Sequence, residues 1–521
     1  MVSRWQAAIA GVVAAAVALG VAELIAIFSG PPSAPLIAVG ATVVDAAPEP
    51  AKDFAIRLFG VHDKTALLVG TTILLAVFAA LIGLAARRWR WAGFAGIGLF
   101  ALIGVSAAVT RPNASWTAAL PTLLGSAAAL FVLFGLLSPT PFALHPYRQK
   151  YAAPDAAIGA EQRGTDGTGR RGFMKLAGAL GLGAVAAGVV GRMISGRRGV
   201  SEARSAITLP QPSSPAPAVP ANVDPAPAPL ARYVTSNRDF YRIDTALVTP
   251  QVDPAGWSLK IHGRVKNPLT ITYAQLMAMP MVERYVTLAC VSNEVGGDLI
   301  SNARWLGVPV ATLLSQAQPE AGADQVVSTS ADGWTCGTPT EVLLDGRDAL
   351  LAVGMNGEPL PVDHGFPVRM VVPGLYGYVS ACKWIVGMEL TSFADFDAYW
   401  IRKGWAAKGP IKTQSRIDVP RGGSTVEAGD VVVAGVAWAQ HRGITAVEVN
   451  VGDGQWRPAE LAGTVGPDTW RQWSLRWNAA PGTYTLQVRA ADTTGELQSS
   501  RKIPIFPDGA EGYHSISVTV R

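Results

Sequence analysis

The chain has 521 residues, of which 49% are hydrophobic and 16% are charged, and its mean hydropathy is +0.27. This apolar composition excludes a purely soluble enzyme and predicts that part of the chain lies in lipid. The net charge of +5 is small for this length, and the arginines cluster at the ends of apolar runs without forming a basic stripe, so no nucleic-acid partner is expected.

Four long apolar runs come first in the chain, at residues 7–28, 65–86, 91–109 and 117–137. A helix of about 20 residues is long enough to cross ~30 Å of hydrocarbon. We therefore predict an all-α transmembrane bundle of four spans within residues 1–140. A shorter apolar run, at residues 35–47, is predicted to belong to an exterior loop.

Positive charge predicts how these spans are oriented. Arg87, Arg88 and Arg90 lie between the second and third runs. Five further basic residues follow the fourth run: Arg148, Lys150, Arg163, Arg170 and Arg171. Because cytoplasmic loops are enriched in Lys and Arg, both loops are predicted to be cytoplasmic. Four spans then begin and end in the cytoplasm.

Residues 141–198 carry a second targeting feature. The run Thr168-Gly169-Arg170-Arg171-Gly172-Phe173-Met174-Lys175 precedes a Gly- and Ala-rich apolar stretch at residues 176–194. It resembles a twin-arginine export signal, which is read by a transporter of already folded proteins. The alternative is an ordinary cytoplasmic flank, which also favours adjacent arginines. Because no clear cleavage site follows, this helix is predicted to remain as a fifth, anchoring span.

Residues 199–231 are rich in Pro, Ala and Ser, a composition that favours extended backbone and predicts a spacer between membrane and enzyme. In residues 232–408, short strand-like runs such as 257–263 and 368–372 alternate with brief helical patches such as 311–316. This pattern predicts a mixed α+β domain.

Residues 409–521 are almost entirely strand and turn. Strand-like runs lie at residues 431–438, 446–451, 473–477, 484–490 and 515–520. Gly452-Asp453-Gly454 is a hairpin-turn sequence between two strands. About seven short alternating strands predict an all-β sandwich of the immunoglobulin type.

The cysteines are the first candidates for chemistry. Cys290, Cys336 and Cys382 lie far apart and form no CxxC pair, which argues against a zinc or iron–sulfur site. Cys290 ends a strand-like run and precedes a polar turn, where it can present a thiolate to a metal or a substrate. Taken alone, such a cysteine is more often a buried structural residue.

Three motifs change that balance. They are Leu288-Ala289-Cys290-Val291-Ser292-Asn293 followed by Asn302-Ala303-Arg304-Trp305-Leu306-Gly307-Val308; the upstream Phe240-Tyr241-Arg242-Ile243-Asp244; and a block at residues 354–384 with His364-Gly365-Phe366-Pro367-Val368-Arg369, Val372-Pro373-Gly374 and Lys383-Trp384. In this order they resemble the sulfite oxidase family of molybdopterin-dependent oxidoreductases, here of a membrane-anchored bacterial type. The resemblance covers residues 233–521.

The resemblance implies a molybdenum–molybdopterin cofactor, with Cys290 as the protein ligand to the metal and oxygen-atom transfer as a two-electron step. The implied cofactor-binding residues are Tyr241, Arg242, Asp244, Asn293, His364, Arg369, Gly374 and Lys383. Fixed cationic donors suit an anionic pyranophosphate, and a soft thiolate suits a metal already held by sulfur. The C-terminal sandwich matches the family's dimerisation domain, which implies a homodimer.

Two positions depart from the sulfite-oxidising pattern. Glu294 stands where sulfite oxidases carry an arginine that helps to bind the substrate anion, and a carboxylate there would repel sulfite. Trp334 aligns near the family's active-site tyrosine, so we place it in the catalytic group. A small substrate other than sulfite is therefore expected.

Electrons need an exit from this chain. No C-x-x-C-H haem motif occurs, so the expected electron partner is another protein or a quinone. The catalytic and C-terminal domains are predicted to lie on the extracytoplasmic side of the plasma membrane. Two alternatives remain open: a non-catalytic exported binding or adhesion protein in which Cys290 is structural, and an enzyme that reduces oxidised side chains or small oxides.

Overall fold

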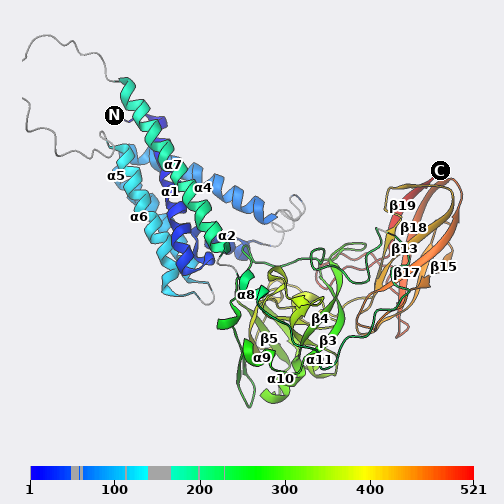
Figure 1. Cartoon of the computed structure of the whole chain (residues 1–521). Coiled ribbons are helices and arrows are strands. Elements are labelled where there is room, and N and C mark those ends of the chain that lie inside the picture. The colour runs from blue at the N-terminus through cyan, green and yellow to red at the C-terminus, as the bar shows by residue number, and fades with distance from the viewer. Residues whose placement is uncertain are drawn as a thin grey trace, which may run out of the picture. The chain divides into compact units, whose positions relative to one another are not determined.

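The computed structural model describes residues 2–48, 58, 63–111, 114–138, 166–197, 200–227 and 229–521. The chain divides into two compact units: Met1–Gly199 with Thr245–Val248, and Val200–Asp244 with Thr249–Arg521. Figure 1 shows the first as a group of helices and the second as a β-rich body.

The helical unit is built around α1, which packs against α4, α6 and α7. Its long helices are α1 (Arg4–Ser29), α4 (Asp63–Arg88), α5 (Arg90–Val109), α6 (Leu120–Leu137) and α7 (Asp166–Arg197). Glycines allow the backbones to approach, because a Cβ built on Gly11 would lie only 1.9 Å from the carbonyl oxygen of Ala79. The five predicted apolar runs are thus confirmed as helices.

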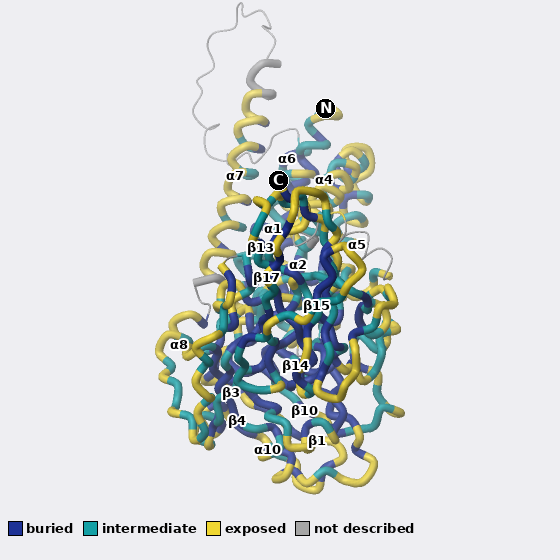
Figure 2. Tube along the Cα trace, turned by 90° about the vertical axis from the view of Figure 1, so that its right-hand side faces the viewer, coloured by how far each residue is buried: buried dark blue, intermediate teal, exposed yellow. Residues whose placement is uncertain are grey.

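These helices have the composition of membrane spans. Five helices among the described residues are long and apolar enough to cross a membrane. Figure 2 shows α7 as largely exposed, and its apolar side chains Leu182 and Val185 are 74% and 62% exposed. Exposed apolar surface of this kind suits contact with lipid.

Two predictions about this unit need separate comment, one on residues 35–47 and one on the basic residues after the fourth run. The run at residues 35–47, predicted to belong to an exterior loop, contains the helix α2 (Pro35–Ala46), with Pro35 in its first turn, where proline is well tolerated. Arg148, Lys150 and Arg163 lie outside the described residues, as does the side chain of Arg170.

The first half of the β-rich unit is a mixed α+β domain, as predicted. One sheet has the order β2-β1-β10-β5-β6, and the other has the order β3-β4-β7-β8 with β9 paired to β7. The strands are β1 (Ser258–Gly263), β2 (Leu269–Thr272), β3 (Val282–Ala289), β4 (Ile300–Pro309), β5 (Gln325–Ser330), β6 (Thr335–Pro339), β7 (Leu350–Met355), β8 (Glu358–Pro359), β9 (Arg369–Val371) and β10 (Ile385–Thr391). Short helices α9 (Tyr273–Met277), α10 (Val310–Ala317) and α11 (Thr340–Leu344) connect them.

The C-terminal part is a β-sandwich, again as predicted. Its sheets have the orders β11-β13-β17-β16 and β12-β19-β18-β14-β15. The strands are β11 (Gln414–Val419), β12 (Thr425–Val426), β13 (Gly429–Trp438), β14 (Ile444–Asn450), β15 (Trp456–Pro458), β16 (Glu460–Leu461), β17 (Arg471–Ala479), β18 (Gly482–Asp492) and β19 (His514–Val520). Gly452 and Gly454 adopt left-handed conformations in the turn between β14 and β15.

The Pro- and Ala-rich segment differs from the predicted spacer. After α8 (Ser201–Ser205), the chain runs along the β-rich unit, where the amide of Ser213 donates to Met281 O at 2.8 Å. Further on, the amide of Asp224 donates to Gln472 Oε1 at 2.7 Å. The extended backbone keeps its polar groups free, so strand β3 and the sandwich can satisfy them. We call residues 206–231 the strap.

Candidate active site

Cys290 follows the last residue of β3 and begins a tight turn. Its amide donates to Leu299 O at 2.9 Å, and its carbonyl oxygen accepts from the amide of Asn293 at 3.1 Å. The side chain of Asn293 closes the turn by accepting from the amide of Leu299 at 2.9 Å. Cys290 as a whole residue is 9% exposed, and burial raises the pKa of its thiol. The turn thus fixes the thiol at the end of a strand.

Tyr241 lies beside this thiol. Its amide donates to Ser301 Oγ on β4 at 3.2 Å, and its ring stacks on Phe240 at a centroid distance of 5.4 Å. Burial raises the pKa of the phenol, and the charged neighbours that act on it are Cys290 and Arg369. Tyr241 therefore joins the cysteine to the cationic part of the site.

Arg369 is a buried cation on β9. It is 4% exposed, its guanidinium donates to the carbonyl oxygens of His364 at 3.1 Å and Met370 at 3.4 Å, and it lies 5.0 Å from the ring of Trp305. Among the described residues no carboxylate pairs with it. Burial lowers its pKa to about 10, so it stays protonated at neutral pH. A buried charge in this state needs an anionic partner.

His364 ends the short helix Val362–His364 and is also buried. Burial, helped by Arg369 and Lys383, lowers its pKa to about 4, so the imidazole is neutral at pH 7. Its Nε2 lies 3.1 Å from the carbonyl oxygen of Asn237. Because a carbonyl oxygen only accepts, Nε2 carries the proton and Nδ1 is an acceptor.

A network of opposite charges completes the group. Lys383 Nζ donates to Asp244 Oδ2 at 2.6 Å, and Arg242 pairs with the same carboxylate at 2.9 Å. Arg242 also pairs with Asp363 at 2.9 Å. Burial lowers the pKa of Lys383 to about 8, although Asp244 opposes that shift. Asp363 was not predicted from the sequence, although it directly precedes the histidine of the motif.

The structure thus brings seven of the predicted residues into one continuous group. They are Tyr241, Arg242, Asp244, Cys290, His364, Arg369 and Lys383. In the described part of the chain, no three His, Cys, Asp or Glu side chains gather as a protein-only metal site. A metal bound by the Cys290 thiolate would take its other ligands from a cofactor. The unpaired, buried guanidinium of Arg369 is available to bind the anionic end of that cofactor. These residues fit an anionic, sulfur-bearing metal cofactor.

The other three predicted residues lie differently. The side chain of Asn293 shapes the cysteine turn, as described above. Gly374 has a left-handed backbone with φ of 84°, and a Cβ on it would meet Arg347 Nη1 at 3.0 Å and His441 at 3.1 Å. The amide of Trp334, in the turn between β5 and β6, donates to Asp332 Oδ1 at 3.1 Å, and its half-buried ring packs against the main core.

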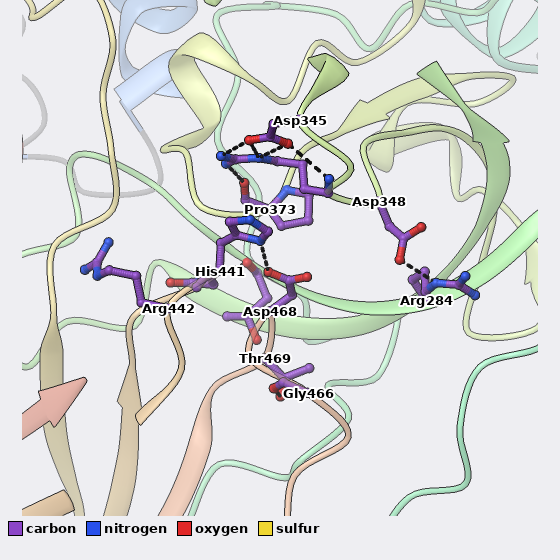
Figure 3. Close-up of polar contacts among 12 residues, drawn as sticks. Arg284, Asp345, Asp348, Pro373, His441, Arg442, Gly466, Asp468 and Thr469 are labelled. Carbon is purple, nitrogen blue, oxygen red and sulfur yellow. Dashed lines mark hydrogen bonds and ion pairs between the residues drawn. The ribbon is translucent and has the colours of Figure 1, made fainter. Parts of the chain in front are cut away.

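The loop that carries Gly374 is held by both domains. The Arg347 guanidinium pairs with Asp345, and its Nη1 donates to Pro373 O at 2.8 Å. Figure 3 shows Asp345 and Pro373 in this loop, with His441 and Asp468 of the sandwich. From the sandwich, His441 Nδ1 lies 3.2 Å from Asp468 Oδ1. The sandwich also reaches β3, because the amide of Thr287 donates to Asp468 O at 2.9 Å. The second domain therefore helps to fix the segments that lead to the cysteine.

Tyr376 follows Gly374 by two residues and was not predicted. It is 4% exposed, and its amide donates to Gly409 O at 2.8 Å. Burial, helped by Asp508 and Cys290, raises the pKa of its phenol to about 12, although a backbone hydrogen bond from Lys412 opposes that shift. The sequence feature that could have identified Tyr376 is its position two residues after Gly374, a glycine of the motif. Asn237 was also missed, because it contributes a backbone carbonyl, which no side-chain motif reveals.

Comparison with known proteins agrees with this geometry. Residues 246–400 match the oxidoreductase molybdopterin binding domain, and residues 414–488 match a bacterial Ig domain. The chain is 32% identical over 157 residues to the uncharacterised oxidoreductase YuiH of Bacillus subtilis, which covers 30% of this chain and 76% of that protein. It is also 30% identical over 339 residues to mitochondrial sulfite oxidase of Rattus norvegicus, covering 55% of this chain and 61% of that protein.

This chain belongs to the sulfite oxidase family of molybdopterin oxidoreductases. It is an oxidoreductase, and its cofactor is molybdenum–molybdopterin. The alternative of a non-catalytic binding protein was therefore wrong. The chain spans about three fifths of the length of the sulfite oxidase it matches. The crystal structure of the sulfane dehydrogenase SoxCD from Paracoccus pantotrophus is 24% identical with a TM-score of 0.49, covering 55% of this chain and 81% of that one.

Proposed function

We propose that this protein is an exported, membrane-anchored oxidoreductase that transfers an oxygen atom to or from a small substrate. The observation that carries the proposal is the continuous group from the Cys290 thiol to the buried Arg369 guanidinium. A thiol and an unpaired buried cation in one group are the two features that a sulfur-bound metal with an anionic tail requires.

When bound, the molybdenum–molybdopterin cofactor supplies two-electron oxygen-atom transfer. Cys290 would hold the metal as a thiolate. Arg369, Lys383 and Arg242 would bind the pyranophosphate through charge-assisted hydrogen bonds. The unprotonated Nδ1 of His364 is suited to accept a hydrogen bond from a pterin N–H group.

Sulfite fits this site poorly. Glu294, four residues beyond Cys290, is an exposed acidic side chain. We therefore propose an uncharged substrate, such as a sulfoxide or an N-oxide, over an oxyanion.

We also propose the cell membrane as the location, with both folded domains on the extracytoplasmic side. Five helices with the composition of spans, and the adjacent arginines that precede the fifth, support this placement. The proposed electron partner is a membrane quinone or a redox protein, and a homodimer through the sandwich is proposed from the family resemblance.

The test is metal, pterin and activity analysis of the full chain purified in detergent. Molybdenum and pterin near one per chain are expected, together with turnover of a sulfoxide or N-oxide that exceeds turnover of sulfite. A folded protein that loads molybdenum but turns over sulfite preferentially would overturn the substrate proposal. A preparation without molybdenum from cells that load another molybdoenzyme would overturn the whole proposal.

A further inference from the structure

The hydroxyl groups of Tyr241, Tyr376 and Tyr378 differ in what they contact. The hydroxyl of Tyr376 accepts a hydrogen bond from the backbone of Lys412, on the segment before β11. The hydroxyl of Tyr378 donates to the carbonyl oxygen of Ala406 at 2.5 Å. Among the described residues, the hydroxyl of Tyr241 has no hydrogen-bond partner. Its donor is thus free for a group that the protein itself does not supply.

The position of that hydroxyl is set by three elements. The Tyr241 oxygen and the carbonyl oxygen of Ala289 both lie 3.8 Å from the point where a Cβ on Gly377 would stand. Ala289 is bonded to Cys290, so the phenol oxygen and the backbone that leads to the metal-ligand residue both approach Gly377. The nearest atom to that built Cβ is Ala381 Cβ at 3.5 Å, and all three distances are ordinary van der Waals contacts.

The ring of Tyr241 is held firmly while its hydroxyl is free. Phe240 stacks against it, and Phe240 itself packs edge-on against Trp305 at 5.6 Å and His364 at 5.4 Å. The amide of Tyr241 is tied to Ser301 on β4. Ring packing and backbone anchoring therefore position the phenol without using its polar end, as expected for a preorganised donor.

We propose that the Tyr241 hydroxyl is a catalytic hydrogen-bond donor that contacts the substrate oxygen at the Cys290 site, instead of holding the pterin. This inference rests on the proposed function and assigns Tyr241 a role that the family resemblance did not imply. The phenol stays protonated and donates a hydrogen bond to the oxygen atom as the charge on that oxygen changes. No proton is transferred, so the two-electron balance of the reaction is unaltered.

The test compares Tyr241→Phe with Tyr378→Phe in full-length protein loaded with cofactor. Tyr241→Phe should keep molybdenum and pterin content while kcat/KM for the best substrate falls roughly 10- to 1000-fold, mainly in kcat. Tyr378→Phe, which loses only a bond to a backbone carbonyl, should retain most activity. If Tyr241→Phe lost pterin in proportion to activity, the residue would be a cofactor ligand and the inference would fail.

A spectroscopic readout tests the same point without relying on turnover. Wild-type protein poised at Mo(V) should show an electron paramagnetic resonance coupling to a proton that disappears in D2O. Tyr241→Phe should alter this coupling, and Tyr378→Phe should leave it unchanged. An identical coupling in Tyr241→Phe and wild type, with equal turnover, would overturn the inference. Absence of molybdenum from the wild type would instead contradict the proposed function.

Discussion

The three cysteines have different surroundings, and the difference makes Cys290 testable against internal controls. Cys336 and Cys382 are fully buried in the main core and contact each other. Cys290 instead ends a strand in a turn and keeps some exposure. Only Cys290 occupies a position from which a thiolate can reach a metal at the surface of the fold.

Cys290→Ser should retain the fold and largely abolish oxygen-atom transfer, because a hydroxyl cannot replace a thiolate in tuning the metal. The visible spectrum of the loaded protein should change with it. Cys336→Ser and Cys382→Ser should cost about 1–3 kcal/mol of stability, because each buries a hydroxyl in an apolar core, and should leave the spectrum unaltered. Turnover, melting temperature and pterin content are measured on all three. Undiminished turnover in Cys290→Ser would remove this residue from the metal site.

His364 gives a pH dependence that belongs to the cofactor-free protein. Its pKa in the folded state is about 4 against 6.5 for an unperturbed histidine, so the unfolded chain binds more protons between those values. The stability that this histidine contributes is fully present above pH 6.5 and is lost as the pH falls through that interval. A shift of this size corresponds to a few kcal/mol, on the order of 3.

Urea unfolding of cofactor-free protein at about pH 7, 5.5 and 4.5 measures this loss in the free energy of unfolding. His364→Gln removes the titrating group, so its stability should depend less on pH over the same interval. Arg369, Lys383 and Asp363 also face the imidazole. Arg369 and Lys383 keep their charge throughout this range, so they are constant in the comparison. Equal pH dependence in His364→Gln and wild type would show that this imidazole is not the group responsible.

At the scale of elements, apolar length was a sufficient signal for the five long helices, because no soluble fold buries runs of that length. The α2 helix was missed because a run of 12 residues is compatible with either a helix or a loop. The strap was missed for a different reason. Its composition describes the backbone conformation of the segment, whereas its hydrogen-bond partners, such as Gln472, lie far away in sequence.

In the site, too, local sequence patterns indicate some features, and contacts between residues far apart in sequence decide others. Residues with side chains in motifs, such as Arg369 and Lys383, could be predicted because the chemistry resides in the residue type. Gly374 was assigned to the cofactor from the family resemblance, and the structure adds that a Cβ on it would meet Arg347 and His441. The His441 contact comes from the second domain, and no local pattern in the first domain encodes it.

The strap should stabilise the sandwich. Asp224 Oδ1 accepts from Gln472 Nε2 at 2.8 Å and from the amide of Tyr233 at 2.9 Å. Asp224→Ala should lower the free energy of unfolding by about 1–3 kcal/mol, because buried donors lose their acceptor. Arg232→Ala is the matched control, since this side chain is 73% exposed and its pairing with Asp224 is worth little. Thermal unfolding of both variants provides the comparison, and equal melting temperatures would mean that the strap is only a tether.

At the scale of the whole molecule, cofactor loading and export constrain each other. The cofactor-binding group is assembled from segments of the β-rich unit that lie as far apart in sequence as Tyr241 and Lys383, so it exists only once this unit has folded. A transporter that moves folded domains is compatible with loading in the cytoplasm, whereas threading an unfolded chain is not. The adjacent arginines before the apolar part of α7 are therefore expected to act as an address, and not only as positive charge.

Replacing Arg170 and Arg171 together by Lys separates these two roles, because the charge is kept while the guanidinium pair is lost. The first four helices should still insert, since their flanking charges are untouched, but the β-rich unit should remain in the cytoplasm. Protease accessibility of the C-terminal sandwich in intact cells lacking an outer barrier measures this. Arg87→Lys with Arg88→Lys is the matched control, because this pair lies in a turn where only charge should matter, and the sandwich should stay exposed. If it also stays exposed in the Arg170 and Arg171 variant, the twin-arginine assignment fails and positive charge alone orients the fifth helix.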